Sequence, residues 1–307
     1  MTFLDRMELA LGRAEYVALT RIAARLTGFR TDVARLGGVS VPFLIRGWGV
    51  PVFLVHGFGG DKESWLLMAR LLQARRTIVI PDLPGFGAAE AIPAERASAK
   101  AQAATLARLM DHLGFARGHL VGNSMGGGIS LRFAKDYPQR ASSMTLIGSV
   151  APVVEVSEVG RALDGGDNPL IVADPNSLDA LVSLVTERAP PSTKAIRRYL
   201  ASDRYARRDA HADLFRGWAL PEEGDGVPLD LETIDTPALV IHGAQDRVIH
   251  PATGRGLAER LPHARLEMME GIGHVPQMEA PSEVAAWIDA FVSGVERQRE
   301  GAATHAA

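Results

Sequence analysis

Short extended apolar segments alternate with helical segments along most of this chain, and the alternation lapses only once. The extended segments fall at 39–45, 51–55, 77–80, 119–121, 143–147, 238–243 and 265–270. Helical apolar spacing separates several of them, most clearly at 98–113 and 125–136. Strands that alternate with helices in this way form a mostly parallel sheet with helices on both faces. The pattern therefore predicts an α/β fold.

The lapse falls between residue 151 and about residue 230. This stretch contains helical segments at 178–187 and 195–205 but no convincing strand, and it holds the prolines at 152, 169, 175, 190, 191, 221 and 228. We therefore expect a helical cap over 151–230, inserted into one core made of 31–150 and 231–293. Residues 294–307 are polar and Ala-rich, and they are expected to form a frayed tail.

Composition limits the kinds of chemistry open to the chain. Its 307 residues suffice to bury a large core without a metal or a disulfide. The net charge of −3 lacks the basic footprint of a nucleic-acid binder, so no nucleic-acid partner is expected. With no Cys, the chain has no disulfide, no thiolate metal site and no Cys nucleophile.

Residues 1–30 are expected to begin with an amphipathic helix. Apolar side chains recur there at spacings of three and four, at Phe3, Leu4, Met7, Leu11, Ala14, Ala18, Ile22 and Leu26. The favoured interpretation is a helix packed on the main domain, and the alternative is a helix lying at a membrane surface. The segment lacks the uninterrupted apolar run of an export signal, which favours a cytoplasmic location and leaves peripheral membrane attachment open.

The motif most indicative of chemistry is Gly-Asn-Ser-Met-Gly at 122–126. It follows a short apolar strand and precedes a helix, which is the setting of a nucleophile elbow. In such a turn the serine adopts a strained backbone conformation, and the flanking glycines let neighbouring main chain approach. The pattern predicts that Ser124 is a nucleophile.

A nucleophilic serine needs a base, and the base needs an orienting acid. His274 follows the last expected strand and Asp246 follows the one before it, so the chain order is Ser, Asp, His. We expect these three side chains to form a catalytic triad at the carboxyl ends of the strands. His56 and His242 are rival bases with a favoured structural role, and Asp82 is expected to hold its own loop.

Acyl transfer at a serine also requires two preorganised N–H donors for the oxyanion. The amide of Met125, directly after Ser124, is one expected donor, and the amide of Phe58 in the HGFGG segment at 56–60 is the other. No metal or cofactor is expected. The acidic residues and histidine at Asp203, Asp209, His211 and Asp213 are interpreted as a charged helix face.

Five ordered motifs together resemble the α/β-hydrolase superfamily: HGFGG at 56–60, PDLPGFG at 81–87, GNSMGG at 122–127, HGAQDRV at 242–248 and GHVPQME at 273–279. Within it, the chain looks most like Moraxella- and Psychrobacter-type bacterial lipases and esterases, through Asn123 and the segments 56–65 and 187–200. The resemblance implies serine-dependent hydrolysis of a small-molecule or lipid carboxylic ester, through an acyl-enzyme and without a cofactor.

Three other functions stay open beside the esterase interpretation. Hydrolases that cleave carbon–carbon bonds in meta-cleavage-type diketones share the GNSMGG motif but usually carry Trp after the catalytic His, where this chain has Val275. Cofactor-free perhydrolases share the triad. A non-catalytic, hydrolase-like binding protein is disfavoured because such proteins usually lose a triad member. Ser124 at the elbow disfavours the relatives that use an Asp nucleophile.

Overall fold

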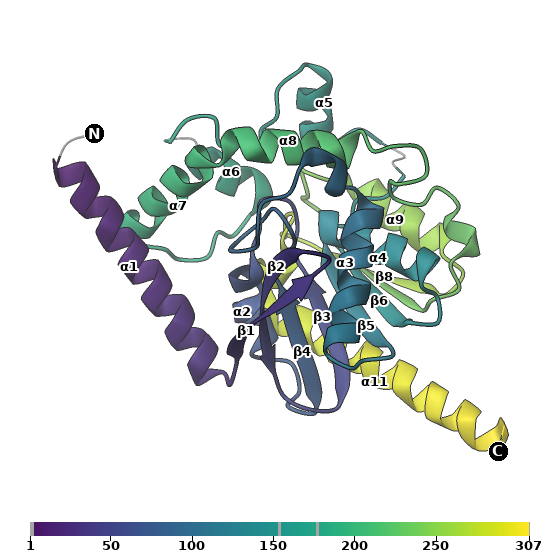
Figure 1. The fold of residues 1–307 in the computed structure, drawn as a ribbon. Coiled ribbons are helices and arrows are strands. Elements are labelled where there is room, and N and C mark those ends of the chain that lie inside the picture. The colour runs from purple at the N-terminus through teal and green to yellow at the C-terminus, as the bar shows by residue number, and fades with distance from the viewer. Residues whose placement is uncertain (1–2, 153–154, 176–177, 307) are drawn as a thin grey trace.

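The protein is built on one eight-stranded sheet. The computed structural model describes residues 3–152, 155–175 and 178–306. Along the sheet the strand order is β1-β2-β4-β3-β5-β6-β7-β8, and every pairing from β4 to β8 is parallel (Figure 1). The strands are β1 (Arg30–Leu36), β2 (Val39–Arg46), β3 (Val50–Val55), β4 (Arg76–Pro81), β5 (Gly118–Asn123), β6 (Ala141–Ile147), β7 (Ala238–Gly243) and β8 (Ala264–Met269). The predicted mostly parallel α/β sheet is confirmed.

Helices cover both faces of this sheet because the central strands are apolar on both sides. In β3, Phe53 and Val55 belong to one buried cluster, while Val52 and Leu54 belong to the other. The first cluster also takes in side chains from α3 (Ala99–His112), α4 (Met125–Asp136) and α9 (Pro251–Arg260). The second takes in η1 (Lys62–Trp65), α2 (Leu66–Ala69) and α11 (Pro281–Ala306). Strands covered in this way read as continuous apolar runs.

All the elements between β6 and β7 that the structure describes are helical. They are α5 (Glu158–Asp164), α6 (Leu178–Val185), α7 (Lys194–Ala206), α8 (Arg208–Ala219) and the short η3 (Leu231–Thr233). Helix α8 packs over the loop after β4 and over α4, since an added Cβ on Gly85 would lie 2.9 Å from Leu214 and one on Gly128 in α4 would lie 3.3 Å from Trp218. Figure 1 shows α5 to α8 gathered at one end of the sheet.

Helix α1 (Phe3–Leu26) packs against α7, and the two helices cross (Figure 1). The two backbones come unusually close at Gly12, where an added Cβ would lie 2.0 Å from the Ala195 carbonyl oxygen. Arg198 of α7 forms ion pairs with both Asp5 and Glu8 of α1. The amphipathic helix expected from the sequence therefore packs on the helices inserted between β6 and β7. None of the described helices combines the length and apolar character needed to cross a bilayer.

The structure differs from the sequence-based expectation at the C-terminal tail and at β1. The tail expected to be frayed from residue 294 is instead the second half of α11, which continues to Ala306. Strand β1 was not predicted, because its side chains are mostly exposed and mixed in charge and it is held by antiparallel pairing to β2. The remaining short elements are η2 (Ala94–Arg96) and α10 (Pro276–Glu279).

Candidate active site

The register of the parallel strands brings several loops to one edge of the sheet. Val55 at the end of β3 pairs with Gly122, and Asn123 at the end of β5 pairs with Ile147 at the end of β6. On the other side, Gly243 at the end of β7 pairs with Met269 at the end of β8. The segments that follow these strands carry all the residues predicted for the site.

Ser124 occupies the turn between β5 and α4 in a strained conformation. Its φ of 55° and ψ of −119° make it the one non-glycine residue with positive φ in the described parts of the chain. Hydrogen bonds fix this turn on both sides, from the Ser124 amide to the Ile147 oxygen (2.9 Å) and from the Gly127 amide to the Ser124 oxygen (2.9 Å). Such strain persists only where the surroundings enforce it, and it concentrates at functional residues.

The glycines around Ser124 are required by close main-chain approach. A Cβ on Gly122 would lie 2.1 Å from the Gly126 oxygen, and a Cβ on Gly126 would lie 2.1 Å from the Val55 oxygen. The turn is thus wedged between β3 and its own helix. The glycine spacing of the motif therefore has a steric cause in this fold.

His274 and Asp246 form a buried pair. His274 Nδ1 lies 2.8 Å from Asp246 Oδ2, and both residues are only 5% exposed. The other carboxylate oxygen accepts hydrogen bonds from the amides of Val248 (2.8 Å) and Ile249 (2.9 Å). The acid is therefore held rigidly, with one oxygen directed to the imidazole.

A second histidine contacts the same carboxylate oxygen. His242 Nε2 lies 3.2 Å from Asp246 Oδ2 and 3.1 Å from the Ile249 carbonyl oxygen. Burial alone would raise the pKa of Asp246, but the charges and hydrogen bonds of His274 and His242 hold it well below its usual value. This contact was not predicted, and its one signal in the sequence is a histidine four residues before the acid at a strand end.

Asn123 ties the three strand ends together at the site. Its Nδ2 donates to the carbonyl oxygens of Ile147 (3.0 Å) and His274 (3.1 Å). This bridge links the segment that carries Ser124 to the one that carries His274. In the described part of the chain, no hydrogen bond joins the Ser124 hydroxyl to the His274 ring. Catalytic hydrogen bonds often tighten only when the substrate binds.

The two expected oxyanion donors border Ser124. A Cβ on Gly57 would lie 3.1 Å from the Ser124 Cβ, which shows how closely the 56–60 loop approaches the serine. Within the described residues, neither the Phe58 amide nor the Met125 amide donates to a protein acceptor. The Phe58 ring is held edge-on by Phe86 and Phe215, with centroids 5.5 and 5.3 Å away.

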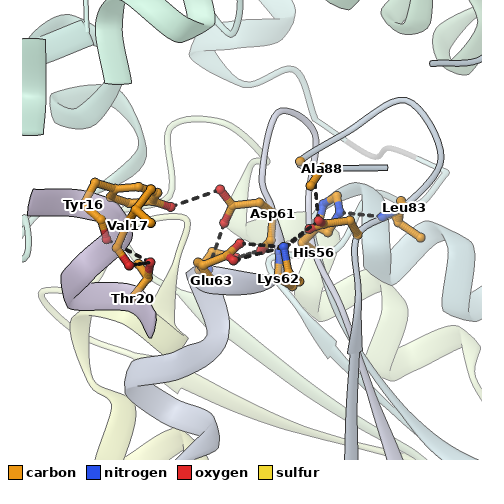
Figure 2. A network of polar contacts seen from close by, with 12 residues as sticks. Tyr16, Val17, Thr20, His56, Asp61, Lys62, Glu63, Leu83 and Ala88 are labelled. Atoms are coloured by element: carbon orange, nitrogen blue, oxygen red, sulfur yellow. Dashed lines mark hydrogen bonds and ion pairs between the residues drawn. The ribbon is translucent and has the colours of Figure 1, made fainter. Parts of the chain in front are cut away.

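The rival residues His56 and Asp82 belong to a separate buried network, in which Figure 2 labels His56 and the Asp82 partners Lys62 and Ala88. Asp82 accepts from the amide of Lys62 (2.8 Å), from Lys62 Nζ (2.7 Å) and from the Ala88 amide (2.9 Å). His56 Nε2 accepts from the Leu83 amide at 3.0 Å, and burial lowers the pKa of His56, which keeps the ring neutral. These contacts fix the loops after β3 and β4.

The charged residues of α7 and α8 do not converge on a common centre. Asp203 pairs with Arg207, Asp209 with Arg208 and Asp213 with Arg216. Among the residues that the structure describes, no group of three or more His, Asp and Glu side chains is placed to hold a metal ion.

Comparison with known proteins agrees with this architecture. The model of the alpha/beta hydrolase fold family matches residues 50–281. Lipase 1 of Psychrobacter immobilis is 31% identical over 82% of this chain and 79% of its own length. The 2-hydroxy-6-oxo-2,4-heptadienoate hydrolase of Pseudomonas putida is 30% identical over 83% of this chain and 94% of its own length.

Among solved structures, a membrane phospholipase A described as a bacterial virulence factor superposes with a TM-score of 0.87. It is 30% identical in sequence, and the match covers 93% of each chain. The matching family model spans most of the core, and the sheet order and the strand–turn–helix at Ser124 fit it. The chain therefore belongs to the α/β-hydrolase fold family.

Proposed function

We propose that this hydrolase cleaves carboxylic esters through an acyl-enzyme formed on Ser124. The observation that carries the proposal is the strained backbone of Ser124 at the β5–α4 turn, which presents a hydroxyl group at the edge where the Asp246–His274 pair also lies. The lipase among the relatives supports an ester substrate. The triad and oxyanion assignments belong to this proposal.

In the proposed mechanism, Ser124 Oγ attacks the ester carbonyl carbon while His274 Nε2 takes the hydroxyl proton. Asp246 keeps the imidazole in the tautomer that carries its proton on Nδ1, and it stabilises the imidazolium that forms. The amides of Phe58 and Met125 donate to the oxyanion of the tetrahedral intermediate. His274 then protonates the leaving alcohol. Water, activated by the same imidazole, attacks the acyl-enzyme and releases the acid.

The first helix supports a lipid or lipid-surface substrate. Met7, Leu11, Leu19, Ile22 and Leu26 form a stripe on α1 in which each side chain is more than half exposed, here called the outer stripe. The acidic side chains of α1 contact α7: Asp5 and Glu8 pair with Arg198, and Glu15 accepts from Thr193.

The exposed charges of α1 are basic and lie at Arg6, Arg13, Arg21 and Arg25. An apolar stripe flanked by arginines matches an anionic lipid surface, so we infer that α1 lies on such a surface and that the helices of 151–230 cap the site and control access to it.

Replacement of the nucleophile tests the proposal. Ser124→Ala should abolish turnover of p-nitrophenyl butyrate and labelling by a fluorophosphonate, while the melting temperature stays close to that of the wild type. The exposed Ser192→Ala is the matched control and should retain both activities. Substantial ester turnover by folded Ser124→Ala would refute the assignment.

The diketone hydrolase among the relatives favours one second candidate, cleavage of a carbon–carbon bond at the same serine. Offering a 2-hydroxy-6-oxo-dienoate and a series of p-nitrophenyl esters to the wild type separates the two reactions. We expect the higher kcat/KM on an ester. A ratio that strongly favours the diketone would transfer the assignment to carbon–carbon hydrolysis.

A further inference from the structure

A large cleft lies outside the proposed triad, between α1, α7 and the loop Gly59–Glu63. Its volume is about 820 Å³, which lies within the range of small-molecule sites, and none of the three triad residues lines it. Two of the residues that line it are in contact, as Figure 2 shows: the Tyr16 side chain of α1 points towards Asp61 in the loop after β3. We call it the arginine cleft, after Arg21, Arg25, Arg30, Arg204 and Arg207 in its lining.

The acidic side chains of the cleft are already engaged. Asp61 accepts from the Tyr16 hydroxyl (3.2 Å) and the Ser64 amide (3.1 Å). Glu63 pairs with Lys62 at 3.0 Å, and Asp203 pairs with Arg207 at 3.1 Å. These contacts account for all three carboxylates in the lining, against six cationic side chains.

Four guanidinium groups of the cleft have no acidic partner in the described parts of the chain. Within the residues that the structure describes, Arg21, Arg25, Arg30 and Arg204 form no ion pair. Arg204 is half-buried, and its Nη1 lies 3.0 Å from where a Cβ on Gly59 would stand. A guanidinium group is thus held against the loop that follows Phe58, while Arg21 and Arg25 approach from α1.

His211, which also lines the cleft, lies close enough to two of the arginines to be affected by their charge. Burial and the neighbouring Arg204 and Arg207 lower the pKa of His211 to about 4, against a smaller opposing effect of Asp203. His211 is therefore neutral near pH 7 and adds no charge of its own. The local potential that disfavours its protonation favours an anion in the cleft.

The rest of the lining suits an amphiphilic ligand. Val17 and Ala24 of α1, Phe29 before β1 and Leu200 of α7 contribute apolar surface beside the arginines. Guanidinium groups bind tetrahedral phosphate oxygens in a bidentate manner, and several of them together match a phosphate group better than a single carboxylate.

We propose that the arginine cleft is a binding site for a phosphate group, supplied by the headgroup of an anionic phospholipid or by free phosphate. Arg204 and Arg21 bind the phosphate oxygens from opposite walls of the cleft, and the apolar lining contacts the carbon skeleton attached to the phosphate. Because the triad does not line the cleft, binding there is independent of the proposed ester hydrolysis.

Binding is measured with full-length Ser124→Ala protein, so that no lipid is turned over. One arm titrates inorganic phosphate by calorimetry. The other arm measures cosedimentation with phosphatidylcholine vesicles that contain or lack phosphatidylglycerol. Whichever arm detects binding by the Ser124→Ala protein, we expect Arg204→Gln to weaken that binding at least tenfold. Arg35→Gln, an equal charge change at an exposed position outside the cleft, should change binding by less than twofold.

The two arms also identify the source of the phosphate. If the protein binds inorganic phosphate but does not prefer vesicles with phosphatidylglycerol, and Arg204→Gln removes the phosphate binding, the ligand is free phosphate. If the protein prefers vesicles with phosphatidylglycerol and Arg204→Gln removes that preference, the ligand is the lipid headgroup. Leu19→Gln, in the outer stripe, should weaken attachment to both kinds of vesicle and leave phosphate binding unchanged.

If Arg204→Gln does not fold, the exposed Arg21→Gln replaces it in both arms. Absence of binding in both arms, or equal weakening by the cleft variant and Arg35→Gln, would overturn the proposal.

Discussion

His242 and Asp246 are joined by a 3.2 Å contact in which the His242 Nε2–H faces the same carboxylate oxygen that His274 contacts. Both side chains of this contact are fully buried. His242 Nδ1 has no partner within the described residues, so it is a buried acceptor without a donor. A buried unsatisfied nitrogen is costly, which indicates that the ring is retained for its other nitrogen. His242 therefore orients the Asp246 carboxylate.

The first prediction concerns this contact. His242→Leu should lower kcat on p-nitrophenyl butyrate by about tenfold to a hundredfold, the equivalent of one hydrogen bond to a charged group. The acidic limb of the kcat/KM profile should also move to higher pH, because Asp246 loses one of the hydrogen bonds that hold its pKa below the usual value. His242→Gln keeps a donor and should restore most of the rate.

The exposed His263→Gln is the control for this pair of variants and should behave as the wild type. If the pH profile of folded His242→Leu is unshifted, His242 contributes only to packing and does not influence the carboxylate.

A second prediction tests the steric basis of the elbow. Gly126→Ala places a methyl group 2.1 Å from the Val55 carbonyl oxygen, a main-chain atom that cannot move aside cheaply. We expect a loss of about 3 kcal/mol in the free energy of unfolding, or failure to fold, measured by urea denaturation. Gly294→Ala in α11, where an added Cβ meets nothing within 4 Å, should instead stabilise by about 0.5–1 kcal/mol.

If the two glycine variants have similar stabilities, the backbone can move enough to remove the clash between the new methyl group at position 126 and the Val55 oxygen.

The sequence allowed the sheet and the position of the elbow to be predicted because both depend on local patterns. Apolar runs mark strands covered on two faces, and Gly122 and Gly126 mark close main-chain approach on either side of Ser124. The arrangement of α1 was harder to predict. Its docking depends on Gly12 and Arg198, which are 186 residues apart and carry no local signal of contact.

The contacts of Asp246 show the same limit. Its pairing with His274 was expected from chain order, whereas its contact with His242 depends on the path of the 243–249 turn and has only their spacing of four residues as a sequence signal. The arginine cleft was likewise invisible, because its walls come from α1, α7 and the loop after β3. Patterns within one element could be recognised, whereas contacts between distant elements were predicted only where ordered motifs marked them, as for Asp246 and His274.

A third prediction follows from His211, whose pKa of about 4 lies below the ordinary value of 6.5. The folded protein binds this proton at lower pH than the unfolded chain does. The contribution to stability is therefore complete above pH 6.5 and is lost as the pH falls towards 4. His211 is 8% exposed, so solvent screening is small and the contribution is about 3 kcal/mol.

Urea denaturation between pH 7 and pH 4 checks this effect. His211→Gln should lose less stability than the wild type over that range. Glu63, whose pKa is raised to about 6 by burial and by Asp61, acts in the opposite direction in both proteins and cancels from the difference. Parallel curves for wild type and variant would contradict the assignment.

The last prediction tests the docking of α1. Gly12→Leu would direct a side chain into the Ala195 carbonyl oxygen, 2.0 Å from the new Cβ, so α1 should separate from α7. Trypsin should then cleave faster after Arg13 and Arg21, measured by mass spectrometry of timed digests. Ala14→Leu adds the same bulk at an exposed position of α1 and should digest at the wild-type rate. Because α1 and α7 are the two walls of the arginine cleft, Gly12→Leu should also lose phosphate binding while p-nitrophenyl butyrate hydrolysis persists. Unchanged digestion would show that the helix pair tolerates the added side chain, and tight phosphate binding by a protein with a detached α1 would place the anion elsewhere.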